Sequence, residues 1–229
     1  MNSKLNTLQI IFEDNHLIVV NKRAGDIVQG DKTGDVPLSE MVKRYIKEKY
    51  NKPGDVYLGV VHRLDRPTSG IVIFAKTSKA LSRLNKAFAE RHTKKTYWAI
   101  VKNKPEPSSA RLIHYLKRNT KQNKSYAHIK AVPESKEAIL TYQLKKSLDN
   151  YHLLEVVLET GRHHQIRSQL SAIGSPIKGD LKYGFDRSNK DASIHLHARS
   201  LELIHPVRKE NINFEAKPPE DSIWNACLY

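Results

Sequence analysis

The sequence contains a single cysteine, Cys227, among its 229 residues. One cysteine excludes a disulfide within the chain, and it excludes a zinc site built from several cysteines. Such low cysteine usage is typical of proteins in a reducing compartment. We therefore expect a cytoplasmic protein, and we expect Cys227 to be an ordinary residue of the carboxyl-terminal tail.

Long hydrophobic runs are also missing. No apolar stretch approaches the ~18–20 residues of a membrane-spanning helix, and the first apolar stretch breaks at Glu13, too early for a signal peptide. Hydrophobic residues still make up 39% of the chain, which excludes a fully disordered protein. Because no Gly/Ser-rich or Pro-rich linker divides the sequence, we expect residues 1–229 to form a single domain.

Acidic residues are scarce relative to basic ones. The chain has 24 Asp and Glu against 39 Lys and Arg, a formal net charge of +15. This charge favours a polyanionic partner, nucleic acid first and an anionic membrane second. A membrane-surface protein needs a cationic amphipathic helix. The helix expected at 38–50 carries Glu40 and Glu48 beside four basic residues, which is typical of an ordinary surface helix.

The excess of positive charge is concentrated between residues 91 and 130. This segment contains eleven Lys and Arg and one acid, Glu106, and Tyr97, Trp98, Tyr115 and Tyr126 lie among the basic residues. Basic side chains neutralise phosphates, and aromatic rings stack on unpaired bases. Residues 118–130 have little apolar content and predict an exposed loop or hairpin. The pattern favours contact with RNA or DNA over a merely solvated surface.

Hydrophobic periodicity predicts more strands than helices. Strands are expected at 8–12, 17–20, 56–61, 71–76, 96–101, 139–144, 153–158 and 194–204. Helices are expected at 38–50, after Ser78 as a capping residue, and at 163–173 before Gly174. Many of the strands look antiparallel. The prediction is therefore an α+β fold with a mixed, largely antiparallel central sheet and flanking helices.

Asp65 lies in a turn-prone segment between two expected strands, and Arg63 and Arg66 flank it. Loops held between rigid strands often carry catalytic groups. Nearby cations favour the ionised carboxylate, which suits a nucleophile or an electrostatic partner better than a general acid. The simpler alternative is an aspartate in a surface salt bridge, which is the more common outcome for an arbitrary aspartate.

A second constellation, GRHHQIR at 161–167, opens the expected third helix. Cationic side chains are unfavourable at a helix amino terminus unless an anion offsets them. Arg167 follows Ile166 of the apolar stripe by about 100° on the helix, so it can flank the buried face and reach a carboxylate. A solvated cationic helix end is an equally good interpretation of this pattern.

The histidines do not have the spacing of a metal site. His163 and His164 are adjacent and point to different faces of a helix, and no HExxH or Cys/His pattern accompanies His195 and His197. No glycine-rich phosphate loop or Ser-His-Asp pattern is present either. We expect no metal site.

Residues 62–70, HRLDRPTSG, closely resemble the HRLDxxTSG signature of the RluA-type family of RNA pseudouridine synthases. All seven fixed positions match. Five further blocks are similar to the family in the same order. They are IIFEDNHLIVVNKRAG (10–25), KKTYWAIV (94–101), KEAILTY (136–142), LETGRHHQIRSQLSAIGSPIKGD (158–180) and LHARSLELIHP (196–206).

The resemblance implies the pseudouridine synthase fold and the isomerisation of uridine to pseudouridine in ribosomal or transfer RNA, without a metal or an organic cofactor. The glycosidic bond to the ring nitrogen breaks, the base rotates, and a bond to carbon-5 forms. By motif position Asp65 is the catalytic aspartate, acting on the uracil ring or on the anomeric carbon. Tyr97 stacks on the target base, Arg167 pairs with the aspartate, and Arg63 fills the space left by the flipped nucleotide.

The sequence departs from the family pattern in two places. Arg23 stands where many relatives have proline. Many relatives also carry a small RNA-binding domain before the catalytic one, and we expect that domain to be absent because the first matching block begins near residue 8. We expect a monomer without an obligate protein partner. The alternative from another class is a synthase-like RNA-binding or RNA-chaperone protein whose catalysis is incidental.

Overall fold

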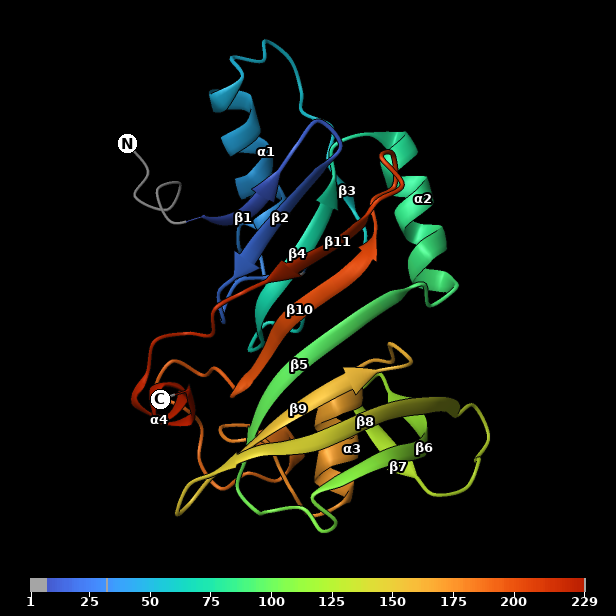
Figure 1. Cartoon of the computed structure of the whole chain (residues 1–229), viewed down its shortest axis with the longest axis vertical. Coiled ribbons are helices and arrows are strands. Elements are labelled where there is room, and N and C mark those ends of the chain that lie inside the picture. Colours follow the sequence, from blue (N-terminus) through green and yellow to red (C-terminus); the bar gives the residue numbers. More distant parts are fainter. Residues whose placement is uncertain (1–7, 32, 229) are drawn as a thin grey trace. The chain divides into compact units, whose positions relative to one another are not determined.

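The computed structural model describes residues 8–31 and 33–228. The chain divides into two compact units. The first unit comprises Met1–Thr93 and Arg199–Lys217, and the second comprises Lys94–Ala198 and Pro218–Tyr229. Figure 1 colours the chain by sequence, so that both segments of each unit can be followed. The expectation of one catalytic domain over residues 1–229 stays a prediction.

The first unit is built on strands in the order β1, β2, β4, β10. Their bounds are β1 Gln9–Glu13, β2 Leu17–Lys22, β4 Ser69–Ala75 and β10 Leu196–Ile204, of which the part from Arg199 belongs to this unit. β2 pairs antiparallel with both β1 and β4. β11 (Asn211–Glu215) pairs with β10, and the two-residue β3 (Gly59–Val60) pairs with β4.

Both faces of β2 and β4 are apolar, so both faces must be covered. All seven residues of β4 are buried. One face packs against Ala80 and Leu84 of α2 (Ser78–Ala89), and the other packs against Leu38, Val42 and Ile46 of α1 (Leu38–Lys49). Burying a Val, Leu or Ile side chain contributes about 1.5–3 kcal/mol. The alternation of side chains along the strands thus fixes one helix on each face.

The second unit repeats this two-sided arrangement at β5 and β9. Its strands lie in the order β5, β9, β8, β6, β7 and pair antiparallel. Their bounds are β5 Thr93–Val101, β9 His152–Leu158, β8 Lys136–Ser147, β6 Ser109–Asn119 and β7 Lys124–His128. α3 (Gln165–Ala172) packs Ile166 and Leu170 on one face, behind β8 and β9 in Figure 1. α4 (Ser222–Leu228) covers Ile100 and Leu153 on the other.

The predicted α+β class with mostly antiparallel strands and flanking helices is confirmed, and most expected elements are present with shifted ends. The strand predicted at 56–61 is wrong in extent, because only Gly59 and Val60 pair with β4. The capping residue of α2 is Thr77 rather than Ser78, since the Thr77 side chain accepts the backbone N–H of Ala80 at 3.2 Å.

The start of α3 and the carboxyl-terminal tail also differ from the predictions. α3 begins at Gln165 because His164 has a left-handed backbone, with a φ of 53°. Cys227 is not a loose tail residue. It lies with Trp224 on α4 and is buried in an apolar cluster. The strands β6 and β11 and the helix α4 were not expected.

A buried carboxylate ties three elements of the first unit together. Glu13, at the end of β1, accepts hydrogen bonds from the Nζ atoms of Lys49 and Lys76 at 2.7 Å and from the hydroxyls of Tyr45 and Tyr50 at 3.0 Å. Burial alone raises the pKa of Glu13, but these four donors outweigh burial and lower its pKa to about 2.

We expect Glu13→Gln to destabilise the protein by about 3 kcal/mol at neutral pH, because the substitution leaves Lys76 without its charged partner. A carboxyl group whose pKa falls on folding stabilises the folded state above its unfolded pKa. The difference between variant and wild type should therefore shrink as the pH falls from about 4.5 towards 2. Urea unfolding at several pH values measures it.

Glu40→Gln is the matched control, because Glu40 pairs with Lys43 on the exposed surface of α1. It should change the free energy of unfolding by less than about 0.5 kcal/mol. Equal effects of the two substitutions would contradict the assignment of Glu13 as a buried anchor.

No helix in the described part of the chain combines the length and the apolar character that crossing a membrane requires.

Candidate active site

Asp65 lies in a tight turn directly before β4 in the first unit. The backbone N–H of Thr68 donates to the carbonyl oxygen of Asp65 at 3.0 Å, which closes the turn. Asp65 is partly buried, whereas its neighbour Arg63 is exposed. Gly70, the second residue of β4, has a φ of 114°, a conformation that a side chain would oppose. The signature therefore forms a defined loop on a fully buried strand.

The buried side chain of Lys22 binds the backbone of this loop. The Nζ of Lys22 donates to the carbonyl oxygens of Thr68 at 2.7 Å, Arg23 at 2.8 Å and Arg66 at 3.2 Å, and the residue is 1% exposed. Burial lowers the pKa of Lys22 to about 8, although the charges of Asp26 and Asp65 act in the opposite direction. Lys22 uses its three donors on backbone carbonyls, so it ties the chain directly after Asp65 to the segment that follows β2.

Two further side chains of the signature, Arg66 and His62, form hydrogen bonds with other parts of the first unit. The guanidinium of Arg66 donates to Asp35 at 2.7 Å and to the Thr33 hydroxyl at 2.8 Å, which ties the turn to the loop before α1. His62 accepts the backbone N–H of Ile73 at 3.2 Å and stacks on Phe88. Of the two arginines that flank Asp65, Arg66 therefore has an anchoring role.

Tyr97 and Arg167 belong to the second unit. Tyr97 lies on β5, opposite Val156 of β9, and is half-buried against the apolar cluster under α3. Arg167 lies on α3 and is 5% exposed. Its Nε and Nη2 atoms donate to the two carboxylate oxygens of Asp180 at 2.7 and 2.8 Å. Arg167 does reach a carboxylate, as the sequence predicts, and Asp180 provides it. Its pairing with Asp65 stays a prediction.

Tyr183 completes the surroundings of Arg167. The Arg167 guanidinium lies 5.0 Å from the centre of the Tyr183 ring, in a cation–π contact. The Tyr183 hydroxyl accepts the backbone N–H of Ser125 at 2.8 Å and lies 2.9 Å from Nδ1 of His164. Residues 180–183, including the short helix η2 (Leu181–Tyr183), thus hold the carboxylate and the ring beside Arg167.

The two histidines of GRHHQIR are structural in this arrangement. Their rings stack with centres 3.8 Å apart. Nδ1 of His163 lies 2.9 Å from the hydroxyl of Ser125, and Nε2 lies 3.1 Å from the side-chain oxygen of Asn123. The pair therefore connects the start of α3 to β7 and to the turn before it. No trio of His, Cys, Asp or Glu side chains within residues 8–31 and 33–228 forms a group suited to a metal ion.

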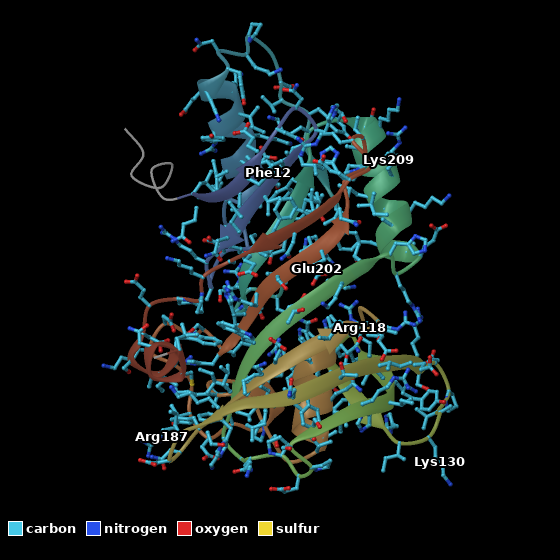
Figure 2. The ribbon with its side chains drawn as sticks, viewed as in Figure 1. Phe12, Arg118, Lys130, Arg187, Glu202 and Lys209 are labelled. Atoms are coloured by element: carbon cyan, nitrogen blue, oxygen red, sulfur yellow. The ribbon has the colours of Figure 1, made fainter. Side chains whose placement is uncertain are left out.

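Within the basic segment, residues 118–130 contain the turn and second strand of the β6–β7 hairpin, so the hairpin rather than the loop predicted for them is present. Lys124 packs over the rings of Tyr126 and Tyr183, and Lys117 lies 3.3 Å from Glu134. Arg118 and Lys121 are exposed at the hairpin, and Lys130 follows it. Figure 2 shows the Lys130 side chain extending away from the ribbon. The cations that remain directed to solvent are suited to phosphate contacts.

The structure thus places Arg63 and Asp65 in one loop of the first unit, and Tyr97 and Arg167 on neighbouring elements of the second. Sequence reasoning missed three residues that hold them: Lys22, Asp180 and Tyr183. The position of Lys22, two residues after the apolar run 17–20, was its only local signal. Asp180 ends the block at 158–180 that resembles the family, but no local signal assigns a role to Asp180 or Tyr183, because their partners lie at the other end of α3 or on β7.

We expect Asp180→Asn to destabilise the protein by about 3–5 kcal/mol, because it leaves the buried guanidinium of Arg167 without its charged partner. Thermal or urea unfolding of the purified variant measures the loss. Asp186→Asn is the matched control, since Asp186 pairs with Lys102 on the surface, and it should cost less than about 1 kcal/mol. An unchanged unfolding midpoint for Asp180→Asn would show that the ion pair of Arg167 and Asp180 does not stabilise the fold.

The chain is similar to known proteins over most of its length. The family model described as RNA pseudouridylate synthase matches residues 16–172. The chain is 34% identical to ribosomal large subunit pseudouridine synthase D of Zymomonas mobilis, over 93% of this chain and 70% of that protein. It is 33% identical to ribosomal large subunit pseudouridine synthase C of Buchnera aphidicola, over 100% of this chain and 73% of that protein.

Solved structures agree with these relatives. The structure of human RNA pseudouridylate synthase domain containing 4 superimposes with a TM-score of 0.78 at 25% identity, covering 96% of this chain and 91% of that one. The predicted pseudouridine synthase fold is thereby confirmed. The chain belongs to the RNA pseudouridylate synthase family, and it is an isomerase that acts on RNA.

Proposed function

We propose that this enzyme converts specific uridines of ribosomal RNA to pseudouridine, with the carboxylate of Asp65 as the catalytic group. The observation that carries the proposal is the loop of the signature. It begins a strand that is buried along its whole length, and Lys22 fixes three carbonyls around it. A nucleophile held on a rigid element loses little entropy when it meets its target.

The other site residues have distinct roles in this proposal. Tyr97 stacks on the target base, which must leave its helical stack before the glycosidic bond can be reached. Arg63, exposed beside Asp65, occupies the space that the flipped nucleotide leaves. Arg167 supplies a positive charge for the carboxylate of Asp65 while Asp180 orients its guanidinium. The bond from C1′ to N1 breaks, the bond from C1′ to C5 forms, and the proton on C5 leaves while N1 becomes protonated.

Ribosomal RNA is favoured over transfer RNA because the two relatives named above are ribosomal large subunit enzymes. The proposal includes a cytoplasmic enzyme that works as a monomer. A single, buried cysteine is compatible with a reducing compartment. The exposed cations of the β6–β7 hairpin supply RNA affinity.

We expect Asp65→Asn to abolish pseudouridine formation, with a loss of at least about a thousandfold, while RNA binding is largely retained. Pseudouridine mapping of total RNA from a deletion strain, with wild-type and variant genes added back, measures it. Sites should disappear on deletion and return with the wild type alone. Asp149→Asn, which removes an exposed carboxylate from the turn between β8 and β9, is the control and should restore every site.

Rescue of the growth or ribosome phenotype by Asp65→Ala, without return of any pseudouridine, would favour the alternative function, an RNA-binding or RNA-chaperone protein whose catalysis is incidental. Loss of sites in transfer RNA rather than in ribosomal RNA would correct the substrate and leave the chemistry unchanged.

A separate prediction concerns the hairpin. We expect the double substitution Arg118→Gln with Lys121→Gln to weaken RNA binding and to flatten its salt dependence. The slope of log K against log salt should fall by about 0.7–0.9 for each phosphate that the variant no longer neutralises. Titration of labelled RNA at several salt concentrations measures both quantities. Lys86→Gln, on the exposed surface of α2, should change neither. An unchanged slope in the double variant would place the RNA elsewhere.

A further inference from the structure

The first unit contains a cavity at the end of β4 opposite Asp65. Its volume is about 620 Å³, within the range of small-ligand sites. It lies among the end of α1, the loop that follows, the β1–β2 turn and the residues directly after β4. β4 has seven residues, so the two ends of the strand are about 20 Å apart. The cavity is therefore separate from the loop of Asp65.

Exposed aromatic rings gather at this cavity. Among the described residues, three tyrosines are the exposed large aromatic side chains: Tyr50, Tyr57 and Tyr126. Two of them, Tyr50 and Tyr57, line the cavity, and each is 48% exposed. The third lies on the β6–β7 hairpin proposed to contact RNA. Half-exposed tyrosine rings are platforms on which unpaired bases stack with little dependence on sequence.

Four of the polar side chains around the cavity are not engaged with the protein. Asn15, Asn51, Lys52 and Asp55 line it, and within the described ranges their side chains form no hydrogen bond or ion pair. Amides can read the edges of a base, and the ammonium of Lys52 can neutralise a phosphate. A carboxylate such as that of Asp55 can accept a hydrogen bond from the 2′-hydroxyl of ribose, the group that distinguishes RNA from DNA.

The side of the cavity formed by Tyr50 and Lys76 is rigid. Glu13 holds the hydroxyl of Tyr50 and the ammonium of Lys76, and Lys76 lies 4.9 Å from the centre of the Tyr50 ring. The Tyr50 ring is therefore fixed before any ligand arrives, which reduces the entropy lost on binding.

We propose that this cavity binds an unpaired nucleotide of the RNA substrate, with its base stacked on Tyr57 and its phosphate near Lys52. This inference rests on the proposed function, because it assumes that the bound nucleotide belongs to the same RNA whose target uridine reaches Asp65. At a rise of about 3.4 Å per nucleotide, the separation along β4 corresponds to about six nucleotides. The cavity gives the enzyme an additional binding site for RNA, outside the nucleotides that surround the target uridine.

The experiment measures binding of a fluorescein-labelled 16-nucleotide oligouridylate by anisotropy, with the full chain. We expect Tyr57→Ala to weaken binding about tenfold, equivalent to about 1.4 kcal/mol and within the range for one stacked base. Tyr57→Phe keeps the ring and should bind within about twofold of wild type. Lys52→Gln should weaken binding about threefold, while Lys86→Gln removes an exposed charge on α2 and should not.

Irradiation of a 16-nucleotide RNA containing 5-bromouridine locates the contact directly. A cross-link to a peptide that contains Tyr50 or Tyr57 is expected, and Tyr57→Ala should reduce it. Unfolding midpoints close to that of wild type show that the variants remain folded. Unchanged affinity of Tyr57→Ala together with the absence of this cross-link would overturn the proposal.

Two controls separate the other outcomes. If Tyr57→Ala abolishes the binding of uridine monophosphate but leaves the affinity for the 16-nucleotide RNA unchanged, the cavity is a site for a free nucleotide and the proposal is wrong. The readout is binding, so it does not depend on catalysis by Asp65. Failure of Asp65→Asn to lose activity would count against the proposed function alone.

Discussion

The fold of the first unit follows from a strand that has no exposed face. β4 is buried from Ser69 to Ala75, and β2 beside it is nearly so. Such strands are stable only if helices cover them on both sides, and α1 and α2 do this. The covered faces have no room for a ligand. Polar groups of the signature and of the cavity accordingly lie at the two ends of the strand, where the chain turns.

A single buried charge secures each of those ends. At the start of β4, the ammonium of Lys22 binds three carbonyls around the turn of Asp65. At the other end, the carboxylate of Glu13 binds two ammonium groups and two tyrosine hydroxyls. Burying a charge is costly unless its partners are well placed, so both groups favour one arrangement of the chain over its alternatives. The same physical device gives a rigid loop for catalysis and a rigid wall for the cavity.

The second unit uses polar contacts in a different way. Two of its strands, β5 and β9, are also covered on two faces, by α3 and α4. Tyr183 and the stacked pair His163 and His164 join the start of α3 to β7, and Asp180 aligns Arg167. The hairpin proposed to contact RNA and the arginine proposed to serve the catalytic carboxylate therefore share one network of hydrogen bonds. Such networks stabilise a unique arrangement only when each member has its partner.

The sequence by itself determined the class of fold, the helix at 38–50, the strands around 17–20 and 71–76, and the signature that carries Asp65, because each depends on local periodicity or on a contiguous motif. Tertiary structure decided the rest. A strand such as β6 alternates too weakly to be seen without β8 beside it, and α4 is defined by the apolar surface that it covers. Lys22, Asp180 and the cavity beside Tyr57 depend on partners distant along the chain. A residue whose role is set by such partners leaves no mark in its own neighbourhood of the sequence.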